Sequence, residues 1–170
     1  MTKPYERLLI VPPSTNGEDA TAAAWSFYCP AALRLARVLV GRTDSHDVMV
    51  NAFLRVDRRR RWSELTNPQS YLLSAVHSEA SNFHRRRRRR LAREVRAFDP
   101  STATGGTDSL DKRVDVRQAV LDLSFAQRAA VYLVYWEDLT EAAAAEVLDV
   151  SPGTVHRNLV RARRHLERTL

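Results

Sequence analysis

The side chains best suited to chemistry in this chain are basic ones, spaced along a short segment near its C-terminus. The stretch VSPGTVHRNLVRARRHL, residues 150–166, opens with Ser-Pro, which is typical of a helix start. Its apolar residues recur at helical spacing: Val155, Leu159, Ala162 and Leu166. The opposite face carries side chains that reach base edges and phosphates: His156, Arg157, Arg161 and Arg164. The pattern favours a helix that reads the major groove of DNA, with a solvated basic face as the alternative.

Residue types that usually carry out catalysis are scattered instead. The histidines, at positions 46, 77, 84, 156 and 165, lack metal-ligand spacing, and Gly105-Gly106 lies in an aperiodic stretch rather than a phosphate loop. Cys29 is the only cysteine, so neither an internal disulfide nor a cysteine metal site is expected. Its place beside Pro30 at a helix start favours a small buried side chain over a nucleophile. We therefore predict no enzymatic activity, no metal and no cofactor.

The charge balance agrees with a polyanionic partner. Lys+Arg is 27 against Asp+Glu 20, giving a net charge of +7 and a pI of about 10.3. Only Lys3 and Lys112 are lysines, so a compositional bias toward arginine could also account for the positive charge. The arrangement of the arginines, not their number, therefore decides whether they bind a polyanion. The apolar run at residues 8–11 is too short for a secretory or membrane segment. A cytoplasmic protein without membrane association is expected.

Hydrophobic periodicity predicts an all-α fold, with two small helical domains joined by a flexible linker. Residues 1–20 are polar and aperiodic and read as a mobile tail, whereas residues 21–96 are helical throughout. Within them, Pro30 and Gly41 would bound one helix, Asp44 would cap the next, and Asn67-Pro68 would open a third. Residues 97–109 are rich in Gly, Ser and Thr and form the predicted linker.

Residues 110–170 form the predicted C-terminal domain of four helices. The first runs to about Leu121, Ser124 caps the second, and Thr140 caps the third, which spans residues 141–148. Ser151 and Pro152 start the fourth, so a very short turn separates the last two helices. This arrangement predicts a helix-turn-helix.

The C-terminal stretch DLTEAAAAEVLDVSPGTVHRNLVRARRHL resembles the promoter-reading domain of bacterial sigma factors of the extracytoplasmic-function (ECF) group. The preceding LDLSFAQRAAVYLVYWEDL is similar to that family's segment before its helix-turn-helix. Response regulators of the luminescence type share a similar motif. The resemblance implies an upstream-element interface made by the following residues: Pro152, Gly153, Thr154, His156, Arg157, Arg161, Arg163 and Arg164.

The N-terminal half resembles the same family independently. DSHDVMVNAFLRV is similar to the helix that docks on core RNA polymerase, and NPQSYLLSAVHSEASNFHRRRRRR to the segment that melts and reads the downstream promoter element. The resemblance implies a polymerase-binding set: Asp44, His46, Asp47, Val50, Asn51 and Leu54. It also implies a downstream-element set: Arg58, Arg59, Arg60, Arg61, Trp62, Asn67, His77, Ser78, Ser81, Asn82, Arg85 and Arg86.

Several of these positions depart from the family pattern or admit another reading. Val50 and Asn51 stand where the family usually has Gln-Glu. Trp62 would either stack on an extruded base or, more commonly, plug the domain core, and His77 and Ser78 would either contact that base or form a solvated face. The arginine run at positions 85–90 suits DNA phosphates, generic RNA binding or a solvated helix end.

The resemblance of both halves implies a sigma factor that directs core RNA polymerase to promoters and helps to open them. Its expected partners are core RNA polymerase and promoter DNA, and the free chain is expected to be a monomer. Members of this group are often held inactive by an anti-sigma factor, which makes such a protein a candidate partner. The alternatives are a stand-alone helix-turn-helix regulator, which would dimerise on a palindrome, and an RNA-binding adaptor that uses the arginine run.

Overall fold

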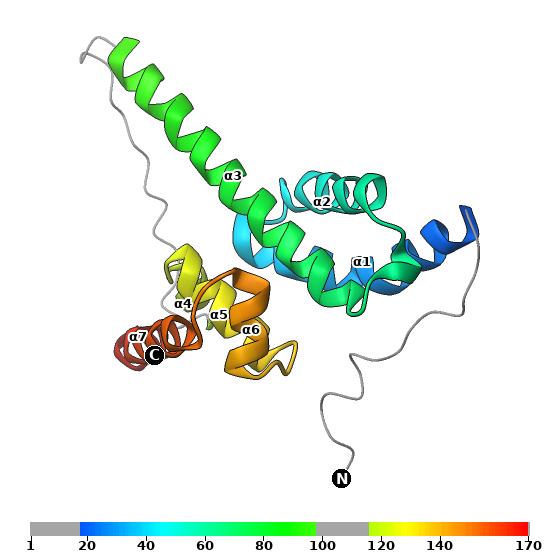
Figure 1. Ribbon diagram of the computed structural model, residues 1–170. Coiled ribbons are helices and arrows are strands. Elements are labelled where there is room, and N and C mark those ends of the chain that lie inside the picture. The colour runs from blue at the N-terminus through cyan, green and yellow to red at the C-terminus, as the bar shows by residue number, and fades with distance from the viewer. Residues whose placement is uncertain (1–17, 98–115, 170) are drawn as a thin grey trace.

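A computed structural model describes residues 18–97 and 116–169, and within these ranges all regular structure is helical (Figure 1). The elements are α1 (Glu18–Val40), α2 (Ser45–Arg59), the 3₁₀ turn η2 (Trp62–Glu64), α3 (Pro68–Ala97), α4 (Val116–Leu121), α5 (Phe125–Tyr135), α6 (Glu141–Leu148) and α7 (Pro152–Thr169). The predicted all-α fold class is confirmed. The predicted tail, apart from the start of α1, and the predicted linker, apart from Ala97, lie outside the described residues.

The N-terminal domain consists of α1, α2 and α3, which all pack against one another. Each helix contributes one apolar face to a common core, as the helical spacing predicted. Leu35 and Leu39 of α1 meet Phe53 and Val56 of α2 and Leu72 of α3, and all of them are buried. Burial of this apolar surface is the main term that holds the three helices together.

The start of α1 is the clearest error of the sequence-based prediction. Pro30 does not open a helix but lies inside α1, which begins at Glu18. A proline in a helix interior removes one backbone donor and crowds the preceding turn. Buried Ala24 and Tyr28 on one side of it, with Leu35 and Leu39 on the other, pack α1 continuously against the core. This burial on both sides outweighs the local cost of the proline.

The turn between α1 and α2 depends on Gly41, as predicted. Gly41 has a φ of +87°, and its N–H donates to the carbonyl of Arg37 at 3.1 Å. Asp44 precedes α2 at the predicted cap position, but its side chain makes no capping bond. The buried Ser45 hydroxyl instead donates to the carbonyl of Arg42 at 2.9 Å.

Substituting Gly41 with alanine should lower the free energy of unfolding by about 1–2 kcal/mol, the cost of a left-handed conformation with a Cβ. A Cβ at this position would meet no atom within 4 Å, so backbone strain alone causes the loss. Gly153→Ala is the matched control, because that glycine is helical and its surroundings are equally open. Urea denaturation checks both variants, and equal stability of the two would contradict the strain at Gly41.

In the C-terminal domain, α5, α6 and α7 pack against one another, and their buried side chains belong to the same hydrophobic cluster as those of the N-terminal domain. Ser124 forms a reciprocal capping box with Gln127 at the start of α5, and the Thr140 hydroxyl caps α6 by accepting from the N–H of Ala143. Pro152 begins α7, and Val155, Leu159 and Ala162 form its buried face. The caps and the buried face predicted from the sequence are therefore confirmed.

The two domains also pack directly against each other. Helix α1 contacts α5, and α3 contacts α6 (Figure 1). The Arg128 guanidinium of α5 donates to the carbonyl of Val38 in α1 at 3.1 Å. Two domains on a flexible tether were predicted, and this contact was not anticipated, because it joins residues far apart in sequence.

Candidate nucleic-acid interface

The turn between α6 and α7 sets the angle at which α7 leaves the domain. Asp149 takes the left-handed conformation, with a φ of 53°, and its N–H donates to the carbonyls of Ala145 and Glu146. The N–H of Val150 donates to the carbonyl of Ala145 at 3.0 Å, which completes a Schellman-type helix end. Because these bonds define the turn, α7 is presented rigidly to its surroundings.

Helix α7 exposes almost all of the residues predicted to read DNA. Pro152, Gly153, His156 and the arginines at 157, 161, 163 and 164 are exposed, and Thr154 is half-buried. The N–H of Thr154 and its hydroxyl both bond to the Ser151 hydroxyl, and the Arg157 guanidinium donates to the Thr154 hydroxyl at 2.9 Å. Arg157 is thereby oriented at the N-terminal end of the helix, where major-groove readers contact base edges.

Two other basic side chains on α7 are tied to the domain beneath them. The Arg163 guanidinium donates to the Tyr135 hydroxyl at 3.3 Å, and the His156 ring lies 3.2 Å from a carboxylate oxygen of Glu141. Both pairs are exposed, so they orient the side chains but contribute little to stability. The arrangement suits an electrostatic surface whose cations remain available to phosphates.

A second basic surface lies on the N-terminal domain. Helix α3 carries the arginine run at positions 85–90, and all of these residues are exposed. Helix α3 continues past this run to Ala97, close to the predicted end of the domain at residue 96, and its last turns project beyond the other helices (Figure 1). The arginines at positions 58–61, at the end of α2 and just beyond it, are exposed as well. Both runs are therefore accessible to a polyanion.

Trp62 does not belong to this exposed surface. Its side chain is 6% exposed, stacks on Phe53 at 4.9 Å and on Tyr28 at 5.9 Å between ring centroids, and donates through Nε1 to Asp57 at 2.7 Å. The expectation that Trp62 contacts DNA is wrong in this structure, and the alternative of a core plug holds. The two stacked rings belong to α1 and α2. Trp62 therefore anchors the loop between α2 and α3 to the core of the N-terminal domain.

The packing of the two domains leaves some of the predicted base-contacting residues of α3 exposed and covers others. Ser78 is exposed, and Ser81 and Asn82 are half-buried. His77 stacks on Phe125 of α5 at 5.2 Å, and burial lowers the pKa of its imidazole. In this arrangement His77 is covered, contrary to the expectation of an exposed contact. Asn67 caps α3 by accepting from the N–H of Ser70 at 3.1 Å.

The predicted polymerase-binding residues share the outer side of α2. His46, Asp47, Asn51 and Leu54 are exposed, whereas Asp44 and Val50 are half-buried. Leu54 is 39% exposed and adds an apolar side chain to this side of the helix. The surface therefore combines one apolar side chain with two acidic ones and remains uncovered by the rest of the described chain.

The described residues contain no histidine, cysteine, aspartate or glutamate cluster suited to a metal ion. Cys29 is buried, and burial raises the pKa of its thiol to about 11, so very little thiolate exists at neutral pH. Across residues 18–97 and 116–169, every helix is too short or too polar to cross a bilayer.

Comparison with known proteins places these surfaces in context. Residues 113–166 match the family described as Sigma-70, region 4. The fold is similar to that of the sigma factor RpoE from Bartonella quintana, solved in complex with the anti-sigma factor NepR. The TM-score is 0.63 at 24% identity, and the match covers 85% of this chain and 92% of that chain. Comparison with curated protein sequences gives no match.

The region 4 match includes α5, the helix-turn-helix and most of α7, whereas the shared fold extends over both helical domains. The two findings are independent and agree with the motifs of both halves. Residues 113–166 therefore match sigma-70 region 4, and the fold of the chain is similar to that of a sigma factor.

Proposed function

We propose that this chain is a sigma factor of the ECF type, which divides promoter recognition between the exposed faces of α7, α3 and α2. Helix α7 enters the major groove of the upstream element, with His156 and Arg157 at base edges and Arg161, Arg163 and Arg164 at phosphates. The observation that carries this proposal is the orientation of Arg157, which the Ser151–Thr154 pair holds at the exposed start of the helix. The partners are promoter DNA and core RNA polymerase, in the cytoplasm.

The N-terminal domain has two roles in the proposal. The outer side of α2, with Asp47, Asn51 and Leu54, docks on core RNA polymerase. The loop that contains the arginines at positions 58–61, together with α3, captures a strand of the downstream element as the duplex opens. A flipped base needs a polar recess beside a cationic surface, and a groove lined by this loop, α3 and part of α6 lies beside these arginines.

A stand-alone regulator would also bind DNA through α7, but it would need no protein-binding surface on α2. The exposed acidic and apolar side of α2 favours a protein-binding surface there. The test is promoter-specific initiation by polymerase reconstituted with the chain. Discrete new start sites support the proposal, and repression of existing transcripts alone would favour the regulator.

Arg85→Ala/Arg86→Ala should weaken binding of the holoenzyme to promoter fragments in a salt-dependent way. Each arginine that neutralises a phosphate releases counterions, so removing two should reduce the slope of log K against log salt by about 2. Arg89→Ala/Arg93→Ala is a control of equal charge further along α3, where the Arg93 side chain bonds to the carbonyl of Arg89. Fluorescence anisotropy at several salt concentrations measures both slopes. Equal slopes for the two double variants would mean that Arg85 and Arg86 contribute only general electrostatic attraction and no specific phosphate contacts.

A further inference from the structure

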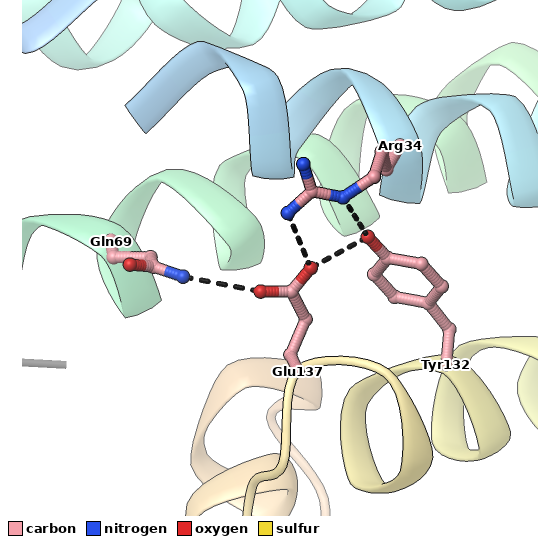
Figure 2. Close-up of polar contacts among 4 residues, drawn as sticks. All are labelled: Arg34, Gln69, Tyr132 and Glu137. Carbon is pink, nitrogen blue, oxygen red and sulfur yellow. Dashed lines mark hydrogen bonds and ion pairs between the residues drawn. The ribbon is translucent and has the colours of Figure 1, made fainter. Parts of the chain in front are cut away.

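The contact between the two domains is centred on one carboxylate, that of Glu137 in the turn between α5 and α6. Its Oε1 lies 3.3 Å from an Arg34 nitrogen of α1 and accepts from the Tyr132 hydroxyl at 2.6 Å. Its Oε2 accepts from the Gln69 side chain of α3 at 3.2 Å, and Arg34 also donates to Tyr132 at 3.3 Å. Figure 2 shows how Glu137 thus bridges α1 and α3 of the N-terminal domain.

The partners contribute unequally to this cluster. The Glu137 side chain is 7% exposed and the Arg34 side chain 54%, so Glu137 has given up most of its hydration. Burial, and then the hydrogen bond to Glu137, raises the pKa of Tyr132, which keeps the phenol neutral and able to donate. A carboxylate that is buried needs these donors, because an unpaired buried charge is strongly disfavoured. Separation of the domains would remove the donors from Arg34 and Gln69 and let water replace them.

The same contact covers part of the surface proposed to capture single-stranded DNA. Phe125, at the start of α5, lies against the rings of His77 and His84 of α3, at 5.2 and 5.3 Å between centroids. A groove of about 560 Å³ is lined by Arg60, Asn67 and Ser74 of the N-terminal domain and also by Glu146 of α6. The C-terminal domain therefore adds a second carboxylate, beside that of Glu64, to the groove in which an incoming phosphate would meet Arg60.

The basic face of α7 is not affected by this contact. Its arginines at positions 157, 161 and 164 are exposed while α5 and α6 pack on the N-terminal domain. The packed arrangement thus leaves the duplex-reading surface accessible and covers the strand-capturing one.

We propose that the C-terminal domain is an intramolecular cover for the strand-capturing face of α3, latched by Glu137 through Arg34, Tyr132 and Gln69. This inference rests on the proposed function of α3. The closed chain presents α7 to duplex DNA and withholds the α3 groove from single strands until the domains separate. The apparent affinity for a single strand is then the affinity of the open form multiplied by its population.

The test uses the full chain with Glu137→Ala and, as a second variant, Arg34→Ala, whose exposed side chain can be removed without disturbing either core. Glu79→Ala is the matched control, because Glu79 pairs with Arg55 at 3.4 Å inside the N-terminal domain and does not touch the contact between the domains. Small-angle X-ray scattering measures compactness. Anisotropy measures binding of a labelled single-stranded DNA 20-mer of random sequence, and of the corresponding duplex.

Both latch variants should enlarge the radius of gyration and tighten single-strand binding by about three- to tenfold, with duplex binding unchanged. The control should change neither quantity. An unchanged radius of gyration in both variants would show that Glu137 does not hold the two domains together. Expansion without tighter single-strand binding would show that the C-terminal domain does not cover the strand-binding face of α3. Expansion with tighter single-strand binding supports the inference. Failure of the chain to initiate transcription with core polymerase would overturn the proposed function alone.

Discussion

Trp62→Ala is expected to lower the free energy of unfolding of the N-terminal domain by about 3–5 kcal/mol. The indole is almost fully buried between Tyr28 and Phe53, so its removal leaves a cavity lined by aromatic rings. The Asp57 carboxylate, which also accepts from Thr21 at 2.9 Å, would lose its indole donor as well. Urea denaturation of the full chain, followed by far-UV circular dichroism, measures the loss.

Trp62→Phe separates the two causes. The smaller ring can still stack, but the bond to Asp57 is lost, and we expect a decrease of about 2 kcal/mol, typical of a hydrogen bond to a charged group. A side chain that served mainly to stack on DNA would behave differently. Its alanine variant would be nearly as stable as the natural chain and would lose strand binding, and that outcome would contradict the core-plug assignment.

Arg157→Ala is expected to reduce the preference of the holoenzyme for its promoter over random DNA by about fivefold to 150-fold, which corresponds to 1–3 kcal/mol for a bidentate base contact. The side chain is exposed at the start of α7 and is oriented by the Thr154 hydroxyl. Competition binding at one fixed salt concentration measures the ratio of specific to non-specific affinity.

Two controls distinguish base reading from charge. Arg157→Lys keeps the charge but loses the planar fork, so specificity should fall while non-specific binding is kept. Arg168→Ala removes an arginine near the end of the same helix, where its Nε bonds to the carbonyl of Arg164 at 3.2 Å, and should weaken all sequences slightly and equally. A uniform loss for Arg157→Ala, matching that of Arg168→Ala, would place Arg157 on phosphates instead.

Features that depend on neighbours in sequence were predictable. The caps at Ser124 and Thr140 and the bounds of α6 follow from hydrogen bonds between a side chain and the backbone three residues later. The buried face of α7 follows from its spacing of apolar residues. The motif order of both halves was also sufficient to suggest the family, which the region 4 match and the fold support.

Features that depend on distant residues were not predictable. Arg34 and Glu137 are separated by 103 positions, so no local signal in the sequence indicates their contact. The same contact covers His77, which sequence reasoning had treated as exposed. Pro30 shows a different limit, because a local preference for helix starts was overridden by packing on both sides of α1.

Run-off transcription shows whether this chain directs RNA polymerase to promoters. Core polymerase from the same organism would be supplied with a genomic fragment library, with and without the full chain. We expect discrete new start sites that disappear with Arg157→Ala and with Leu54→Glu on the outer side of α2. Unchanged start sites, or only repression of existing transcripts, would contradict this expectation.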